Sequence, residues 1–154
     1  MRATTSPYWQ HPSREYARLH VDLVANSPLK LKETFEYEKA GKGAREIVTV
    51  SKWRGAYFAT KSQASAAVIA SAYVVSDTPA TSDVIVIHYG KGAFGRQASA
   101  AVYARPHVPI EIARKIVSQD TRSFELSIDE FWRLHWFDAH ELASSASGNP
   151  SDND

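Results

Sequence analysis

The chain has 154 residues, of which 44% are hydrophobic and 11% aromatic, and this composition predicts a single folded domain with a sizeable core. It contains no cysteine, which excludes disulfides, thiolate catalysis and cysteine-ligated zinc. The formal net charge is +1, no apolar run approaches the ~18 residues that a membrane-spanning helix needs, and no secretory signal pattern is recognisable, so a soluble, intracellular protein is expected.

The first half of the chain predicts mainly strands. Residues 1–12 are rich in Pro, Ser and Thr and predict an irregular arm. Residues 13–24 fit two patterns, because their apolar positions alternate as in a strand and also recur at helical spacing. Residues 29–37 alternate cleanly, with Lys30, Lys32, Thr34 and Glu36 on one face, which predicts a half-buried strand. A further strand is predicted for residues 46–53.

The second half of the chain mixes helix and strand signals. An alanine-rich stretch, residues 62–76, predicts a helix, and residues 84–89 predict a buried strand with residues 98–104 as its hairpin partner. Pro109 precedes a helical apolar face, and Ser127 with Glu130 forms a capping-box pattern before a helix that is predicted to run to Leu142.

These elements predict an α+β fold, a mostly antiparallel sheet with helices on one face and the other face open. The predicted domain spans residues 13–143, after the arm of residues 1–12 and before a disordered, polar tail of residues 144–154.

The charge is unevenly distributed along the chain. Residues 30–61 hold eight Lys or Arg against four Glu (+4), and residues 84–115 hold five against one (+4). Residues 116–154 hold two against eight acidic residues (−6). A basic surface of this kind attracts phosphate groups, although ordinary solvated surface charge explains it as well.

Two patterns suggest other chemistry. His135, Asp138 and His140 are candidate metal ligands, but two histidines five residues apart on a helix point to different sides, so no metal site is predicted. The segment Gly55-Ala56-Tyr57-Phe58 resembles a motif of the ADP-ribosyltransferases, in which a strand end leads into a helix and the tyrosine stacks on nicotinamide. An enzyme of that type is therefore kept as an alternative.

Three short segments, in the same order, resemble the RNA-silencing suppressors of tombusviruses and aureusviruses. They are Thr4-Thr5-Ser6-Pro7-Tyr8, Arg18-Leu19-His20-Val21-Asp22 and Pro28-Leu29-Lys30-Leu31-Lys32-Glu33-Thr34-Phe35. The resemblance covers about a fifth of the chain and includes no catalytic signature. Arg14 and Ala17 stand where tombusvirus members have two tryptophans that measure duplex length, so the chain looks closer to the aureusvirus type.

The resemblance implies a viral, non-enzymatic protein of the host cytoplasm that suppresses RNA silencing by sequestering small interfering RNA duplexes. It also implies a homodimer with one continuous, concave basic sheet, a helix over residues 13–24, and no cofactor. Double-stranded RNA is held through phosphates and 2′-hydroxyls rather than bases. The predicted RNA-binding residues, chosen mostly by charge and location, are Lys30, Lys32, Lys39, Lys42, Lys52, Arg54, Lys91 and Arg96.

A third reading is a protein-interaction module that uses the aromatic side chains near the C-terminus. Trp132, Trp136 and Phe137 supply the large apolar surface that such contacts favour. Their segment is acidic, so it is expected to repel RNA and to serve for packing or dimerisation.

Overall fold

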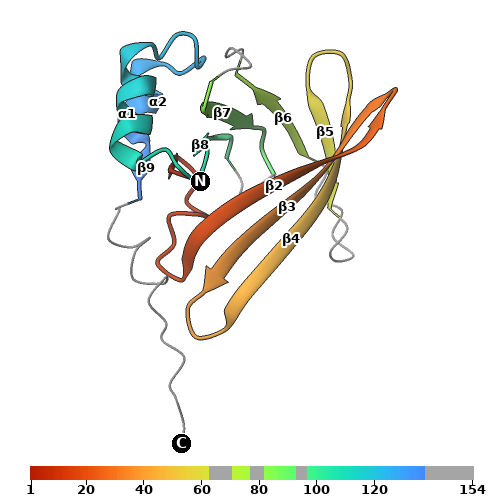
Figure 1. The fold of residues 1–154 in the computed structure, drawn as a ribbon, viewed down its shortest axis with the longest axis horizontal. Coiled ribbons are helices and arrows are strands. Elements are labelled where there is room, and N and C mark those ends of the chain that lie inside the picture. Colours follow the sequence, from red (N-terminus) through yellow and green to blue (C-terminus); the bar gives the residue numbers. More distant parts are fainter. Residues whose placement is uncertain (63–70, 77–81, 93–96, 138–154) are drawn as a thin grey trace, which may run out of the picture.

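A computed structural model describes residues 1–62, 71–76, 82–92 and 97–137. Nine strands form one sheet, and two short helices follow the eighth strand (Figure 1). The strands are β1 (Ala3–Thr4), β2 (Arg14–Asn26), β3 (Leu29–Lys39), β4 (Gly43–Trp53), β5 (Phe58–Ser62), β6 (Ser71–Val75), β7 (Val84–Tyr89), β8 (Ser99–Ala104) and β9 (His135–Trp136). The helices are α1 (Ile110–Gln119) and α2 (Ile128–Arg133).

The sheet is an antiparallel meander. Its order is β2-β3-β4-β5-β6-β7-β8-β1-β9, so strands β2 to β8 each pair with the next strand along the chain. Two glycines with positive φ, Gly41 and Gly43, form the tight turn between β3 and β4, where other residues would be strained. The sheet curls into a half-barrel with a concave and a convex face (Figure 1).

The predicted α+β class is therefore wrong, since the described chain is mainly a curled antiparallel sheet with little helix. The helices, ten and six residues long, lie at one end of the sheet and leave most of it uncovered. Two segments account for part of the error, because described residues in each were expected to be helical and pair as strands instead.

The first of these is residues 13–24, for which the family resemblance implied a helix. The structure has strand β2 here, joined to β3 through ten Cα partners, among them Leu19 with Phe35. The second is the alanine-rich stretch, residues 62–76, of which the structure describes residue 62 and residues 71–76; Ser62 ends β5 and Ser71–Val75 forms β6. In the described residues of both segments, pairing with neighbouring strands outweighs a weak local helix preference.

Other elements were predicted correctly. β7 covers residues 84–89 as expected, and β3, β4 and β8 differ from the predicted strands by three residues or fewer at either end. α1 begins after Pro109, and the capping box of Ser127 and Glu130 is present. α2 ends at Arg133, which is earlier than the predicted Leu142.

The core has two parts, on opposite faces of β7 and β8. On the convex face, Val84 and Val86 pack with Ala113 and Val117 of α1. On the concave face, the alternate residues of the same strands join an aromatic cluster. Because side chains alternate along a strand, one pair of strands separates the two clusters. The concave cluster comprises Trp9, Phe35, Phe58, Tyr73, Ile87, Tyr89, Ala101 and Tyr103.

The N-terminal residues are part of this packing. Ala3 and Thr4 form β1 between β8 and β9, and Trp9 is only 2% exposed, with its ring stacked on Phe35. The predicted tail, residues 144–154, lies outside the described residues. None of the helices in the described ranges is long and apolar enough to cross a membrane.

Candidate ligand-binding cavity

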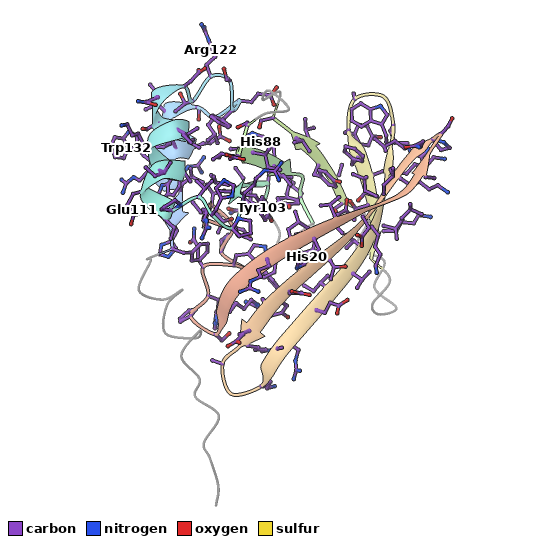
Figure 2. The ribbon with its side chains drawn as sticks, in the orientation of Figure 1. His20, His88, Tyr103, Glu111, Arg122 and Trp132 are labelled. Atoms are coloured by element: carbon purple, nitrogen blue, oxygen red, sulfur yellow. The ribbon has the colours of Figure 1, made fainter. Side chains whose placement is uncertain are left out.

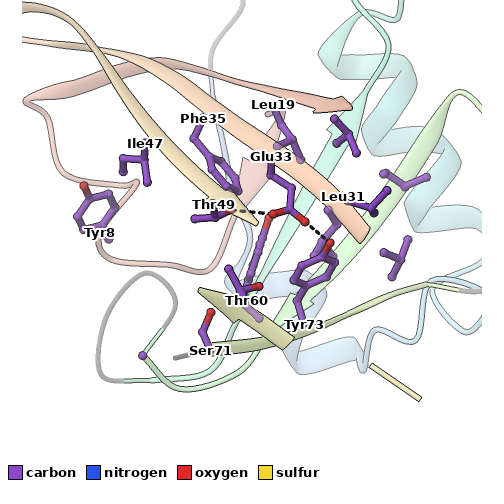
Figure 3. Close-up of a pocket in the computed structure, with 16 residues that line it drawn as sticks. Tyr8, Leu19, Leu31, Glu33, Phe35, Ile47, Thr49, Thr60, Ser71 and Tyr73 are labelled. Carbon is purple, nitrogen blue, oxygen red and sulfur yellow. Dashed lines mark hydrogen bonds between the residues drawn. The ribbon is translucent and has the colours of Figure 1, made fainter. Parts of the chain in front are cut away.

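The concave face of the half-barrel contains a cavity of about 450 Å³ (Figure 3). Small-molecule sites are typically clefts of about 300–1,000 Å³ with mostly apolar walls and few polar groups. Two of the lining residues, Val21 and Val75, are substantially exposed, which places them at the cavity mouth. The apolar side chains of the lining are Leu19, Val21, Leu31, Phe35, Ile47, Val75, Ile85 and Ile87.

In the part of the lining that the structure describes, one side chain carries a charge, and it is Glu33 of β3. Glu33 is only 3% exposed. Its Oε2 accepts a hydrogen bond from Thr49 Oγ1 at 2.7 Å, and its Oε1 accepts one from the Tyr73 hydroxyl (Figure 3). Oε2 also accepts a hydrogen bond from Ser51 Oγ at 2.8 Å. Ser51 Oγ lies 2.7 Å from Thr60 Oγ1, which extends the chain of hydroxyls. Buried carboxylates require such partners, because an unsatisfied one is costly.

The curl of the sheet brings these groups together. Thr49 is the direct register partner of Glu33 on the neighbouring strand β4. Tyr73 belongs to β6, three strands away from β3 in the sheet order. Adjacent strands are about 4.8 Å apart, so a flat sheet would separate these two backbones by roughly 14 Å. The hydrogen bond from Tyr73 to Glu33 therefore depends on the half-barrel shape.

The buried tyrosines of the concave face hold their protons strongly. Burial raises the pKa of Tyr73, and its hydrogen bond to the Glu33 carboxylate raises it further. Burial also raises the pKa of Tyr89 and of Tyr103, whose hydroxyl oxygens lie 3.0 Å apart. These side chains consequently remain neutral hydrogen-bonding groups over the physiological range.

The predicted RNA-binding residues do not line this cavity. Lys30 and Lys32 alternate with the cavity residues Leu31 and Glu33, so they lie on the convex face. Lys52 is the register partner of Lys30 and shares that face. The structure thus brings three of the predicted cations together, but on the convex face and not on the concave face that the resemblance implied.

The remaining predicted residues are dispersed. Lys39 and Lys42 lie at the turn between β3 and β4, Arg54 lies between β4 and β5, and Lys91 follows β7. Arg96 lies outside the described residues.

The other motifs that the sequence suggested are also placed. Tyr57 of the ADP-ribosyltransferase-like segment is 43% exposed in the connection between β4 and β5. The segment leads into strand β5, and residues 63–70, where the motif expects a helix after the strand, lie outside the described residues. His135 lies in β9, while Asp138 and His140 lie outside the described residues. The described ranges hold no cluster of three or more metal-ligating side chains.

Trp132 projects from α2 and is 72% exposed (Figure 2). Trp136, in β9, is partly buried and packs against the convex-face cluster. The two rings therefore do not form one exposed aromatic surface.

Glu33 is the candidate site residue that the sequence analysis missed. The sequence does contain an indication of it. In the alternating pattern of residues 29–37, Glu33 falls in the same phase as Leu31 and Phe35 and so lies on the apolar face of its strand. A carboxylate on an apolar face needs partners inside the protein. Those partners come from β4 and β6, and only the fold identifies them.

Comparisons with known proteins assign no family to the chain. No protein-family model, curated protein or solved structure matches it significantly. The cavity itself is therefore the feature that bears on function.

Proposed function

We propose that the protein binds a small, largely apolar organic molecule in the concave cavity of its sheet. The observation that carries this proposal is a cavity of about 450 Å³ with eight apolar side chains in its lining and a hydrogen-bonded carboxylate within it. Burial of apolar ligand surface would supply most of the affinity, at about 25 cal/mol per Å² before the costs of association.

The two valines at the end of β6 allow a matched test. Val75 lines the cavity at its mouth, whereas Val74 lies on the opposite face of the strand. Their side chains are almost equally exposed, at 37% and 38%. The variant Val75→Trp places an indole over the cavity, and Val74→Trp adds the same group to the outer surface.

The assay is equilibrium dialysis of the full chain with N-phenyl-1-naphthylamine, a neutral apolar probe. We expect saturable binding of one molecule per chain. Val75→Trp should weaken it by at least about tenfold, since the indole occupies ligand volume, and Val74→Trp should leave it unchanged. Absence of saturable binding, or an equal loss in the two variants, would contradict the proposal.

Duplex RNA binding is a second candidate, and Lys30, Lys32 and Lys52 support it. Three cations on the uncovered convex face of β3 and β4 suit phosphate contacts, although Asp22 of β2 is the register partner of Lys32 and offsets one of them. If the protein binds duplex RNA, three further predictions go with that function: suppression of RNA silencing, a homodimer and a location in the host cytoplasm. A gel shift with an RNA duplex, compared between the wild type and Lys30→Ala/Lys52→Ala, tests this candidate. An unchanged shift would exclude this surface.

A further inference from the structure

The inference concerns Glu33 and the kind of ligand that its surroundings favour, and it rests on the proposed function. Among the described residues of the cavity lining, Glu33 is the one charged group, and it is almost completely buried. We propose that the cavity binds an apolar molecule carrying a protonated amine, and that the amine donates a hydrogen bond to Glu33 Oε1 (Figure 3).

The hydrogen-bonding capacity of the carboxylate leaves room for such a donor. A carboxylate offers about four acceptor positions, two on each oxygen. Thr49 and Ser51 use Oε2, while Tyr73 is the one donor to Oε1 among the described residues. One acceptor position on Oε1 therefore stays available to a donor on a molecule in the cavity.

The charge of Glu33 is not balanced by the described part of the chain. No Lys, Arg or His nitrogen there lies within 4 Å of its carboxylate, and its partners are neutral hydroxyls. A buried charge without a counter-charge is unfavourable, so a cationic ligand gains more here than a neutral ligand of equal shape. An anionic ligand would be repelled.

The aromatic lining favours the same class of ligand. Tyr8, Phe35, Tyr73 and Tyr89 all contribute to the cavity wall. The faces of aromatic rings attract cations, and the attraction strengthens when water is excluded. A divalent metal ion fits less well, because such ions take several oxygen ligands and usually more than one carboxylate.

Three naphthyl compounds of nearly equal size test the proposal by equilibrium dialysis. They are 2-(1-naphthyl)ethylamine, which is cationic at pH 7, 2-(1-naphthyl)ethanol, which is neutral, and 1-naphthaleneacetate (the carboxylate, not the ester), which is anionic. We expect the amine to bind roughly 10- to 100-fold more tightly than the alcohol, as for a hydrogen bond between charged groups. The acetate should bind most weakly.

Variants on one strand identify the group responsible. Glu33→Gln keeps the shape of the side chain and should reduce amine affinity to that of the alcohol, while alcohol binding changes little. Glu38→Gln removes an exposed carboxylate in the opposite alternation phase of β3 and should leave both affinities unchanged. Thermal melting establishes that each variant is folded.

The outcomes separate the two claims. Equal binding of amine and alcohol by the wild type, or an amine preference that survives in Glu33→Gln, would overturn the inference and leave the proposed function standing. If Glu33→Gln does not fold, the wild-type comparison of the three compounds still decides. Failure of N-phenyl-1-naphthylamine and all three naphthyl compounds to bind would overturn the proposed function, and this inference with it.

Discussion

Removal of a single hydroxyl measures how much the buried network stabilises the sheet. Tyr73→Phe deletes the donor to Glu33 Oε1 and keeps the ring, which stacks on Phe58 with centroids 5.0 Å apart. Tyr73 is 7% exposed and Glu33 is 3% exposed. A hydrogen bond to a charged group contributes about 1.5–3 kcal/mol, so we expect the free energy of unfolding to fall by that amount.

Urea denaturation followed by far-ultraviolet circular dichroism measures this loss. For a domain of this size each kcal/mol corresponds to roughly 2–4 °C, so the melting temperature should fall by about 3–12 °C. Tyr57→Phe is the control, since Tyr57 is 43% exposed and its change should stay within ~0.5 kcal/mol. A Tyr73→Phe protein as stable as the Tyr57→Phe protein would refute the reasoning that Tyr73 and Glu33 stabilise the curl.

Two further predictions concern pH and the helix cap. The folded-state pKa values of Tyr73, Tyr89 and Tyr103 are raised, so the stability they confer is full below the unfolded value near 10 and is lost as pH rises above it. Between pH 9 and 11 the free energy of unfolding should fall by about 1.4 kcal/mol in total for each such tyrosine, and denaturation over this range checks this; a flat profile would contradict it. Ser127→Ala removes the acceptor of the Glu130 amide and should cost about 0.5–2 kcal/mol in urea denaturation, whereas an unchanged midpoint would show that the cap is dispensable.

Short sequence patterns predicted strands and helix caps correctly where residues close together in the sequence determine the structure. β7 is apolar and short, and the capping box needs only Ser127 and Glu130, so both could be identified from the sequence. Residues 13–24 carried strand and helix periodicities together, and the hydrogen bonds to β3 decide for the strand. The register partners lie up to 25 positions apart, as Arg14 and Lys39 do, so a short window of sequence does not reveal this pairing.

The same limit applies to the candidate site. Alternation places Leu31, Glu33 and Phe35 on one face of β3, which the sequence alone establishes. The curl of the sheet, and with it the meeting of Glu33 and Tyr73, results from how nine strands twist and pack. The predicted RNA-binding residues were chosen mostly by charge and by location in strands or turns, and neither specifies which face of a curled sheet is concave.

The central claim is that a small molecule occupies the concave face, and strand β7 provides the most direct measurement. Ile85 and Ile87 line the cavity, while Val84 and Val86 on the same strand pack on the convex side. Methyl NMR spectra should be recorded during titration with 2-(1-naphthyl)ethylamine. Our account predicts ring-current shifts at the two isoleucines and none at the two valines; shifts confined to the valines, or no shifts at all, would contradict it.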